Sequence, residues 1–146
     1  MFDFNGNLIV IRHAPTAENK QGVCLGRLEN IPFEVEVEKV CELVKNEPSL
    51  NGISFIISSS LNRARVTAER INNFLKAGNF IIDPRFNDLD FGWFCGKDPK
   101  LIQEVQPEIY DHRKFFKYDI ALKEGESLEM LEKRVRKGLN ELLLLS

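Results

Sequence analysis

Short apolar runs alternate along this chain with longer stretches in which apolar residues recur at helical spacing. Residues 8–11 (LIVI) and 53–57 (ISFII) are two such runs, and residues 80–82 (FII) form a third that Asp83 and Pro84 close. Apolar runs of this length, rich in β-branched residues, are typical of strands buried on both faces of a parallel sheet. The pattern therefore predicts strands in these three places.

Amphipathic helices are predicted between and after the strands. Apolar residues recur every three or four positions over 34–46, 64–75 and 128–142. The opening residues of the first segment also alternate with period two, so a strand start stays open there. Pro48 ends that segment, and Ser127 is placed to cap the last helix at its N-terminus.

The stretch between the third strand and the last helix has a different character. Residues 84–98 are rich in aromatic side chains but follow neither a helical nor a strand period, which indicates a loop. Pro99 and Pro107 are each placed to start a short helix, because proline is tolerated in the first helical turn.

The order strand, helix, strand, helix, strand, helices predicts an α/β fold, with a mainly parallel sheet flanked by helices. No repeat and no Pro- or Gly-rich linker divides residues 1–146, so we expect a single domain. Ligands of such sheets bind at the carboxyl ends of the strands. Arg12 and His13 follow the first predicted strand and residues 58–63 follow the second, which places the expected site at this edge.

Composition and charge narrow the classes of function. The 146 residues are 43% hydrophobic and 29% charged, and the formal net charge of −2 argues against general nucleic-acid binding. No run approaches the ~20 apolar residues of a membrane span and no secretory signal is visible, so we expect a cytoplasmic protein without membrane contact. Cys24, Cys41 and Cys95 lack metal-ligand spacing and indicate plain thiols in a reducing compartment.

Two arginines and a histidine come together at the predicted strand ends. Arg12 and Arg63 carry planar guanidinium groups suited to phosphate oxygens, and the helix after the second strand adds free N–H donors. His13 beside such an anion site can attack phosphorus as a nucleophile while its other ring nitrogen donates to a backbone carbonyl. A nearby carboxyl must then protonate the leaving alcohol. Asp88 is the candidate for this role and Asp90 its competitor.

Four stretches of the sequence carry a resemblance to a known family. They are RHAPTAEN (12–19), SSSLNRARVTAERI (58–71), DPRFNDLDFGWFCGK (83–97) and GESLEMLEKRV (125–135). In this order they resemble the motifs of the histidine phosphatase superfamily, also called phosphoglycerate-mutase-like, with Ala14 in place of a usual glycine. The chain length and the last motif resemble small bacterial phosphatases of the α-ribazole phosphate type.

The resemblance implies a role for each matching residue. His13 would be the phosphorylated nucleophile, and Asp88, where the family usually has a glutamate, would be the proton donor. No metal and no cofactor is implied, and the partner would be a small phosphorylated substrate. The residues expected to hold the phosphoryl group or cover the substrate are Arg12, Asn19, Arg63, Leu25, Gly26 and Arg27, with Glu126 and Ser127 bordering the pocket.

The chain also departs from the family pattern. Family members carry a second histidine in an S-H-G motif on a strand after the last helix, and this sequence stops at LNELLLLS before it. The other histidine, His112, precedes the last motif and lies in the wrong order for that role. We therefore expect a phosphoglycerate-mutase-like fold truncated at its C-terminus. The strand at 8–11 would then have an open edge, to be covered by the last helix, by a second subunit in a homodimer or by an exchanged segment.

Three functions follow from these observations. The first is a metal-independent phosphomonoesterase that acts on a small phosphorylated metabolite through phospho-His13, and the intact His13 favours it. The second is a non-catalytic or weakly active remnant that binds a phosphorylated ligand through the same arginines, which the loss of the second histidine favours. The third is phosphoryl transfer of the phosphoglycerate mutase type. The short chain disfavours it, because a mutase must keep water from its phosphoenzyme in a closed pocket.

Overall fold

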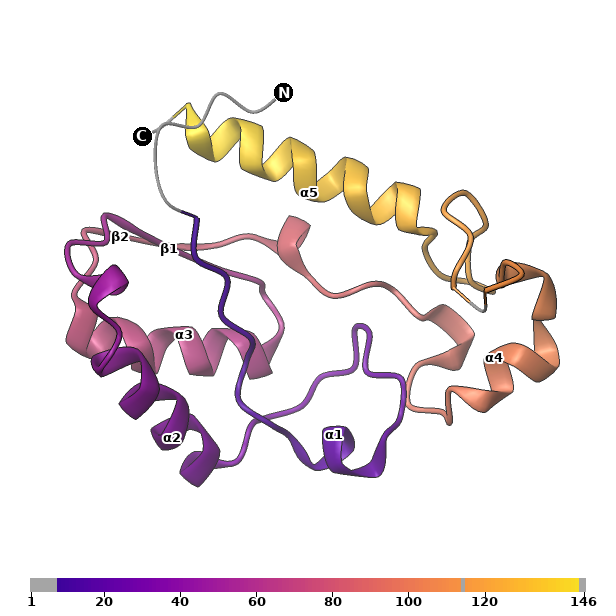
Figure 1. Ribbon diagram of the computed structural model, residues 1–146, viewed down its shortest axis with the longest axis horizontal. Coiled ribbons are helices and arrows are strands. Elements are labelled where there is room, and N and C mark those ends of the chain that lie inside the picture. The colour runs from indigo at the N-terminus through magenta and orange to yellow at the C-terminus, as the bar shows by residue number, and fades with distance from the viewer. Residues whose placement is uncertain (1–7, 114, 145–146) are drawn as a thin grey trace.

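The computed structural model describes residues 8–113 and 115–144 (Figure 1). Its helices and strands are, in chain order, α1 (Ala17–Gln21), α2 (Glu34–Lys45), β1 (Phe55–Ser58), α3 (Asn62–Leu75), β2 (Asn79–Ile82), α4 (Lys100–Val105) and α5 (Leu128–Leu143). Short 3₁₀ turns lie at Pro48–Leu50, Pro84–Phe86, Gly92–Phe94 and Pro107–Ile109. The fold is α/β.

β1 and β2 form a parallel pair, which confirms two of the three predicted strands. Phe55 pairs with Asn79 and Ser58 with Ile82. α3 connects the two strands and packs on β1, and α2 packs on α3. In Figure 1, α2 and α3 lie on one side of the strands and α5 on the other, so helices flank the sheet as predicted.

The prediction of a buried strand at residues 8–11 is wrong. These residues have no regular secondary structure, and Leu8 is 64% and Val10 85% exposed. An apolar run forms a buried strand only where a neighbouring strand and a covering layer are present. Within the described residues the sheet consists of β1 and β2, so this segment has no strand to pair with.

The helix predictions are confirmed, including the one for residues 34–46, where a strand start was the alternative. The segment with mixed periodicity is a helix from its first turn, where Glu34 and Glu36 stabilise the N-terminus through the helix dipole. α5 begins directly after Ser127, whose hydroxyl oxygen accepts a hydrogen bond from the N–H of Met130. Pro99 precedes the short helix α4 as expected.

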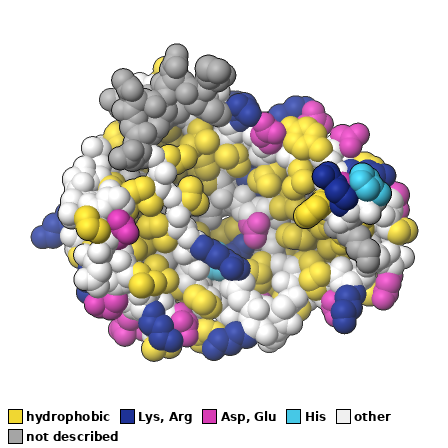
Figure 2. All heavy atoms as spheres, viewed as in Figure 1, with side chains coloured by type: hydrophobic (Ala, Val, Ile, Leu, Met, Phe, Trp, Pro, Cys, Tyr) yellow, Lys and Arg dark blue, Asp and Glu magenta, His cyan; other side chains and the backbone are white. Residues whose placement is uncertain are grey.

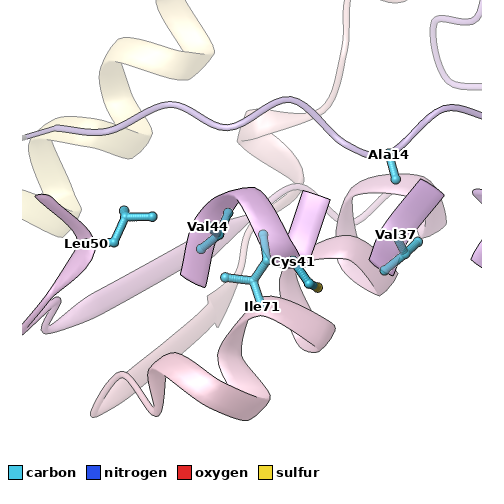
Figure 3. Close-up of a cluster of buried hydrophobic side chains, with 6 residues drawn as sticks. All are labelled: Ala14, Val37, Cys41, Val44, Leu50 and Ile71. Atoms are coloured by element: carbon cyan, nitrogen blue, oxygen red, sulfur yellow. The ribbon is translucent and has the colours of Figure 1, made fainter. Parts of the chain in front are cut away.

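Two separate clusters of buried apolar side chains make the core. The first lies between α2, α3 and the segment that carries His13, and Figure 3 shows Ala14 pointing from that segment toward the helix that carries Val37. Its buried members are Ala14, Val37, Cys41, Val44, Leu50 and Ile71. The second lies among the loops and short helices that follow β2, together with Cys24 from the loop between α1 and α2. Its other buried members are Leu89, Phe94, Ile102, Ile109 and Leu122.

Candidate active site

His13 lies between the exposed apolar segment and α1. Its imidazole is half-buried, and Nδ1 lies 2.8 Å from the carbonyl oxygen of Ala14. Because a carbonyl only accepts, Nδ1 donates the ring proton in the neutral imidazole and Nε2 keeps its lone pair. This is the tautomer that a nucleophilic histidine requires.

The surroundings of His13 favour the neutral imidazole. Burial is the largest influence and lowers the pKa of His13 below its ordinary value of 6.5. The hydrogen bond to Ala14 opposes this shift in the pKa. The positive charges of Arg63 and Arg12 reinforce it, and the negative charge of Asp88 opposes it. The charges of three other predicted site residues thus act on the imidazole of His13, which is mainly neutral at pH 7.

A buried threonine ties the segment of His13 to α3. The N–H of Ala14 donates to Oγ1 of Thr67 at 3.1 Å, and this hydroxyl donates to the carbonyl of Arg63 at 2.7 Å. Thr67 is only 3% exposed, so each of these polar groups depends on the others for its hydrogen bond. Thr67 is not among the predicted site residues, although it lies in the motif at 58–71.

Arg63 brings a buried positive charge to the site from the first turn of α3. Its Nη1 donates to the carbonyl of Leu28 at 2.9 Å and to Oδ1 of Asn30 at 3.3 Å. Its Nη2 donates to the carbonyl of Gly26 at 2.6 Å and to the carboxylate of Asp88 at 3.2 Å. A guanidinium that is 1% exposed requires such a set of partners, because an unpaired buried charge is costly.

The two competing carboxylates have different surroundings. The side chain of Asp88 is 47% exposed beside Arg63, and its Oδ1 accepts from the N–H of Leu89 at 2.8 Å. Asp90 instead accepts from the N–H of Gly92 at 2.9 Å and pairs with Arg27 at 3.3 Å. Asp88 thus has one edge on Arg63 and the other toward solvent, whereas Asp90 is held by Arg27 and by the backbone of Gly92. The choice of Asp88 as the acid stays a prediction.

Arg12 and Asn19 have different relations to the site. Arg12 is exposed next to His13. Oδ1 of Asn19 accepts from the N–H of Thr16 at 3.0 Å and from its hydroxyl at 3.2 Å, which completes a capping box at the start of α1. The contacts of Asn19 in the structure are therefore those of a helix cap, and its part in phosphate binding stays a prediction.

The loop at 25–27 is joined to the segment that follows β2. The carbonyl of Leu25 accepts from the thiol of Cys95 at 3.1 Å. Gly26 has φ +47°, and a Cβ on it would lie 2.9 Å from the carbonyl oxygen of Leu89, so glycine is required here. Arg27 binds carboxylates of the protein, which makes it a support of the site as well as a predicted substrate contact.

Glu126 connects this loop to the start of α5. Burial alone would raise the pKa of its carboxyl. Hydrogen bonds from Arg134 and from the N–H of Asp90 outweigh burial and, with the charge of Arg27, hold the pKa of Glu126 below its ordinary value. Glu126 is therefore an anion at neutral pH, bound on all sides by protein groups.

The face of the molecule in Figure 2 carries hydrophobic and charged side chains side by side. Basic and acidic side chains lie close together near the middle of the face in Figure 2, among hydrophobic ones. No group of His, Cys, Asp or Glu side chains that could hold a metal ion is found within residues 8–113 and 115–144. In the same part of the chain, no helix is long and apolar enough to cross a membrane.

His112, the other histidine of the sequence, is exposed in a turn.

The fold and the site together define an α/β protein with a buried arginine and a carboxylate beside a free imidazole nitrogen. The model of the histidine phosphatase superfamily (branch 1) matches residues 8–145. The chain belongs to this family, which confirms the resemblance read from the four motifs.

Individual relatives carry several phosphatase and mutase names. The chain is 28% identical over 134 residues to "Putative phosphoserine phosphatase 2" of Hydrogenobacter thermophilus, covering 92% of this chain and 65% of that protein. It is 30% identical over 139 residues to "Probable phosphoglycerate mutase GpmB" of Serratia proteamaculans, covering 93% and 62%. The crystal structure of a "putative alpha-ribazole-5'-P phosphatase" from Escherichia coli superimposes with a TM-score of 0.75 at 20% identity, covering 93% and 66%. The chain thus spans a little under two thirds of the length of the first two relatives.

Proposed function

We propose that this chain hydrolyses a small phosphomonoester through a phosphohistidine on Nε2 of His13, without a metal. The observation that carries the proposal is the hydrogen bond from Nδ1 of His13 to the carbonyl of Ala14. It leaves Nε2 as the free nitrogen of an imidazole on which the charges of Arg63 and Asp88 act.

The reaction has two steps. In the first, Nε2 attacks phosphorus, the N–P bond forms and the P–O ester bond breaks, and Asp88 in its protonated form gives a proton to the leaving oxygen. Arg12 and Arg63 stabilise the negative charge on the phosphoryl oxygens. In the second, Asp88 takes a proton from a water molecule, which attacks phosphorus and releases phosphate from His13.

Arg63 links substrate binding to the acid. Its Nη2 now donates to the Asp88 carboxylate, 3.2 Å away. A phosphoryl group at this nitrogen would replace that carboxylate, because a dianion is the stronger partner for a guanidinium. The negative charge of the phosphoryl group would favour protonation of the released carboxylate, which would take up a proton from solvent. Asp88 would then turn to the leaving oxygen as the acid, so that the arrival of substrate prepares the proton donor.

Hydrolysis of 4-nitrophenyl phosphate by this chain in the presence of a chelator tests the proposal. We expect turnover that survives EDTA, and a loss of at least ~10³-fold in His13→Ala, since the nucleophile is removed. His112→Ala is the matched control and keeps parental activity, because His112 is exposed in a turn. Activity that is lost with EDTA, or that is equal in His13→Ala, contradicts the proposal.

The names of the relatives support a small hydroxylated compound as the alcohol part of the substrate. The mutase among them makes phosphoryl transfer to a second hydroxyl an alternative fate of phospho-His13. Labelled phosphate recovered on an added diol acceptor, rather than as inorganic phosphate, would favour that alternative.

A second candidate is a phosphate-binding protein without turnover. It is favoured by the sequence, which holds one histidine besides His13, and by the exposure of that residue, His112. Vanadate binding in the absence of phosphohistidine and of hydrolysis would support it. A cytoplasmic location and a homodimer stay predictions alongside either candidate.

A further inference from the structure

α5 sends one guanidinium to the back of the candidate site. A guanidinium has five N–H donors, and all five of Arg134 are used. Nε and Nη2 each donate to the Glu126 carboxylate at 2.8 Å, a bidentate pair. Nη1 donates to the carbonyls of Arg85 at 2.8 Å and Asn87 at 2.7 Å, and Nη2 also donates to the carbonyl of Asp88 at 2.8 Å.

The three carbonyls belong to the short stretch 85–88, which ends at the candidate acid. The carbonyl of Asp88 faces Arg134, and its carboxylate faces Arg63. Two arginines from different helices therefore hold this one residue, by its backbone and by its side chain. Without the hydrogen bonds from Arg134 to the backbone, the Asp88 carboxylate would keep its hydrogen bonds from Arg63 and from the N–H of Leu89.

Glu126 extends the same support to the other side of the acid. Besides Arg134, its carboxylate accepts from the N–H of Asp90 at 3.0 Å and from Arg27 at 3.2 Å. The Arg134–Glu126 pair thus fixes the backbone on both sides of Asp88. A mostly buried network in which the members satisfy one another is rigid, and rigidity of this kind sets the position of a catalytic group.

We propose that Arg134 is a positioning residue for proton transfer by Asp88. The inference rests on the proposed function. In the described contacts Arg134 binds Glu126 and backbone carbonyls, and it has none with His13. Its loss should therefore slow the proton transfer to the leaving oxygen and leave the attack of His13 on phosphorus largely intact.

The test compares two substrates with different need for an acid. Nitrophenolate leaves with little help from a proton, whereas an alkoxide from glycerol phosphate requires one. We would measure the single-turnover rate of phosphohistidine formation from each substrate in the parent chain and in Arg134→Gln. General acid catalysis contributes about 10²–10⁴-fold, so we expect a loss of ~10²-fold with glycerol phosphate and less than ~5-fold with 4-nitrophenyl phosphate.

Two comparisons show whether Arg134 acts through Asp88. Asp88→Asn should give the same selective loss, and the double variant should lose little more than Asp88→Asn alone, because both changes remove one function. Lys133→Gln is the matched control: it removes a neighbouring positive charge on α5 whose side chain is 71% exposed and pairs with Glu129. Both substrates should react at parental rates in it.

Three kinds of result would count against the positioning role of Arg134 or against the proposed function. Equal losses on the two substrates, or losses of Arg134→Gln and Asp88→Asn that multiply in the double variant, overturn the inference. If Arg134→Gln does not fold by circular dichroism, Arg134→Lys decides: lysine keeps the charge with three donors, and a selective loss of smaller size is expected. A parent chain that forms no phosphohistidine contradicts the proposed function itself. The parent chain is measured first, so this failure is distinguished from a failure of the inference about Arg134.

Discussion

The two halves of this molecule are stabilised in different ways, one by packed regular elements and the other by loops bound to polar side chains. The half with α2, β1, α3 and β2 packs regular elements around the first apolar cluster (Figure 3). The half that follows β2 has short helices and loops around the second cluster, and polar side chains bind its backbone carbonyls. Regular elements satisfy their own backbone groups, whereas this loop-rich half needs arginine side chains to do so, as Arg134 does for the carbonyls of Arg85 and Asn87.

The candidate site lies where these two halves meet. Thr67 and Ala14 belong to the first half and hold the segment of His13. Arg134 and Glu126 hold the segment of Asp88 in the second half. Arg63 joins the halves, because it begins in α3 and donates to loop carbonyls and to Asp88. The proposed nucleophile and acid are thus held by separate parts of the molecule, so substitutions in one part should affect one of them more than the other.

The largest effect is expected at the residue that joins the halves. Arg63→Met should destabilise the protein by about 3–5 kcal/mol, because it leaves buried carbonyls and an aspartate without their cation, and it should abolish vanadate binding. Urea unfolding and vanadate titration measure the two effects. Arg65→Met, on the same helix in an exposed pair with Glu69, is the control and should change stability by less than about 0.5 kcal/mol. Similar values for both variants would contradict this role of Arg63.

The loop-rich half should be sensitive to a single methyl group. A Cβ at Gly125 would lie 2.4 Å from the carbonyl oxygen of Asp90, in rigid backbone. We expect Gly125→Ala to cost about 2–4 kcal/mol and to displace the loop beside Asp88. At Gly78 a Cβ would have its nearest neighbour 3.9 Å away, so Gly78→Ala should be nearly neutral. Thermal unfolding of the two variants checks this, and equal melting temperatures would show that the close approach does not matter.

A smaller effect is expected at Thr67, where two substitutions distinguish the role of the hydroxyl group from that of side-chain volume. Thr67→Val leaves the buried N–H of Ala14 without an acceptor, which costs about 1–3 kcal/mol, and it loosens the segment of His13. Thr67→Ser keeps the hydroxyl and should retain turnover close to that of the parent. Turnover lost equally in both variants would assign the role of Thr67 to packing instead.

The smallest effect concerns pH. The pKa of His13 is lowered by burial and by the charges of Arg63 and Arg12. Since the neutral imidazole is the nucleophile, activity should persist below pH 6.5 and fall only as pH drops through the lowered pKa. Arg12→Gln removes one positive charge and should move this acid limb to higher pH. An NMR titration of the His13 ring in the two proteins checks the direction, and a shift to lower pH would contradict it.

The regular half was largely predictable from the sequence because burial imposes a period. Val37, Cys41 and Val44 recur at helical spacing and are all buried in α2. The run at 8–11 has the same local character as β1, yet it is exposed. A local pattern cannot reveal whether a partner strand is present, and this is the physical reason for the error.

The site was predictable in part. The motifs pointed to His13 and to Arg12, Arg63 and Asp88, whose charges act on its imidazole. Their supports, Thr67 and Arg134, were not assigned to the site. Both act on backbone groups distant in sequence, and such contacts leave no period that a sequence could show.

The most direct test of the account is to trap the phosphoenzyme. The chain would be mixed with ³²P-labelled phosphomonoester, quenched in alkali and digested, and the labelled peptide sequenced by mass spectrometry. We predict an acid-labile, alkali-stable phosphate on His13, absent from His13→Ala and formed in the presence of EDTA. A label on another residue, or hydrolysis with no phosphohistidine at any time point, would contradict the central claim that His13 is the nucleophile.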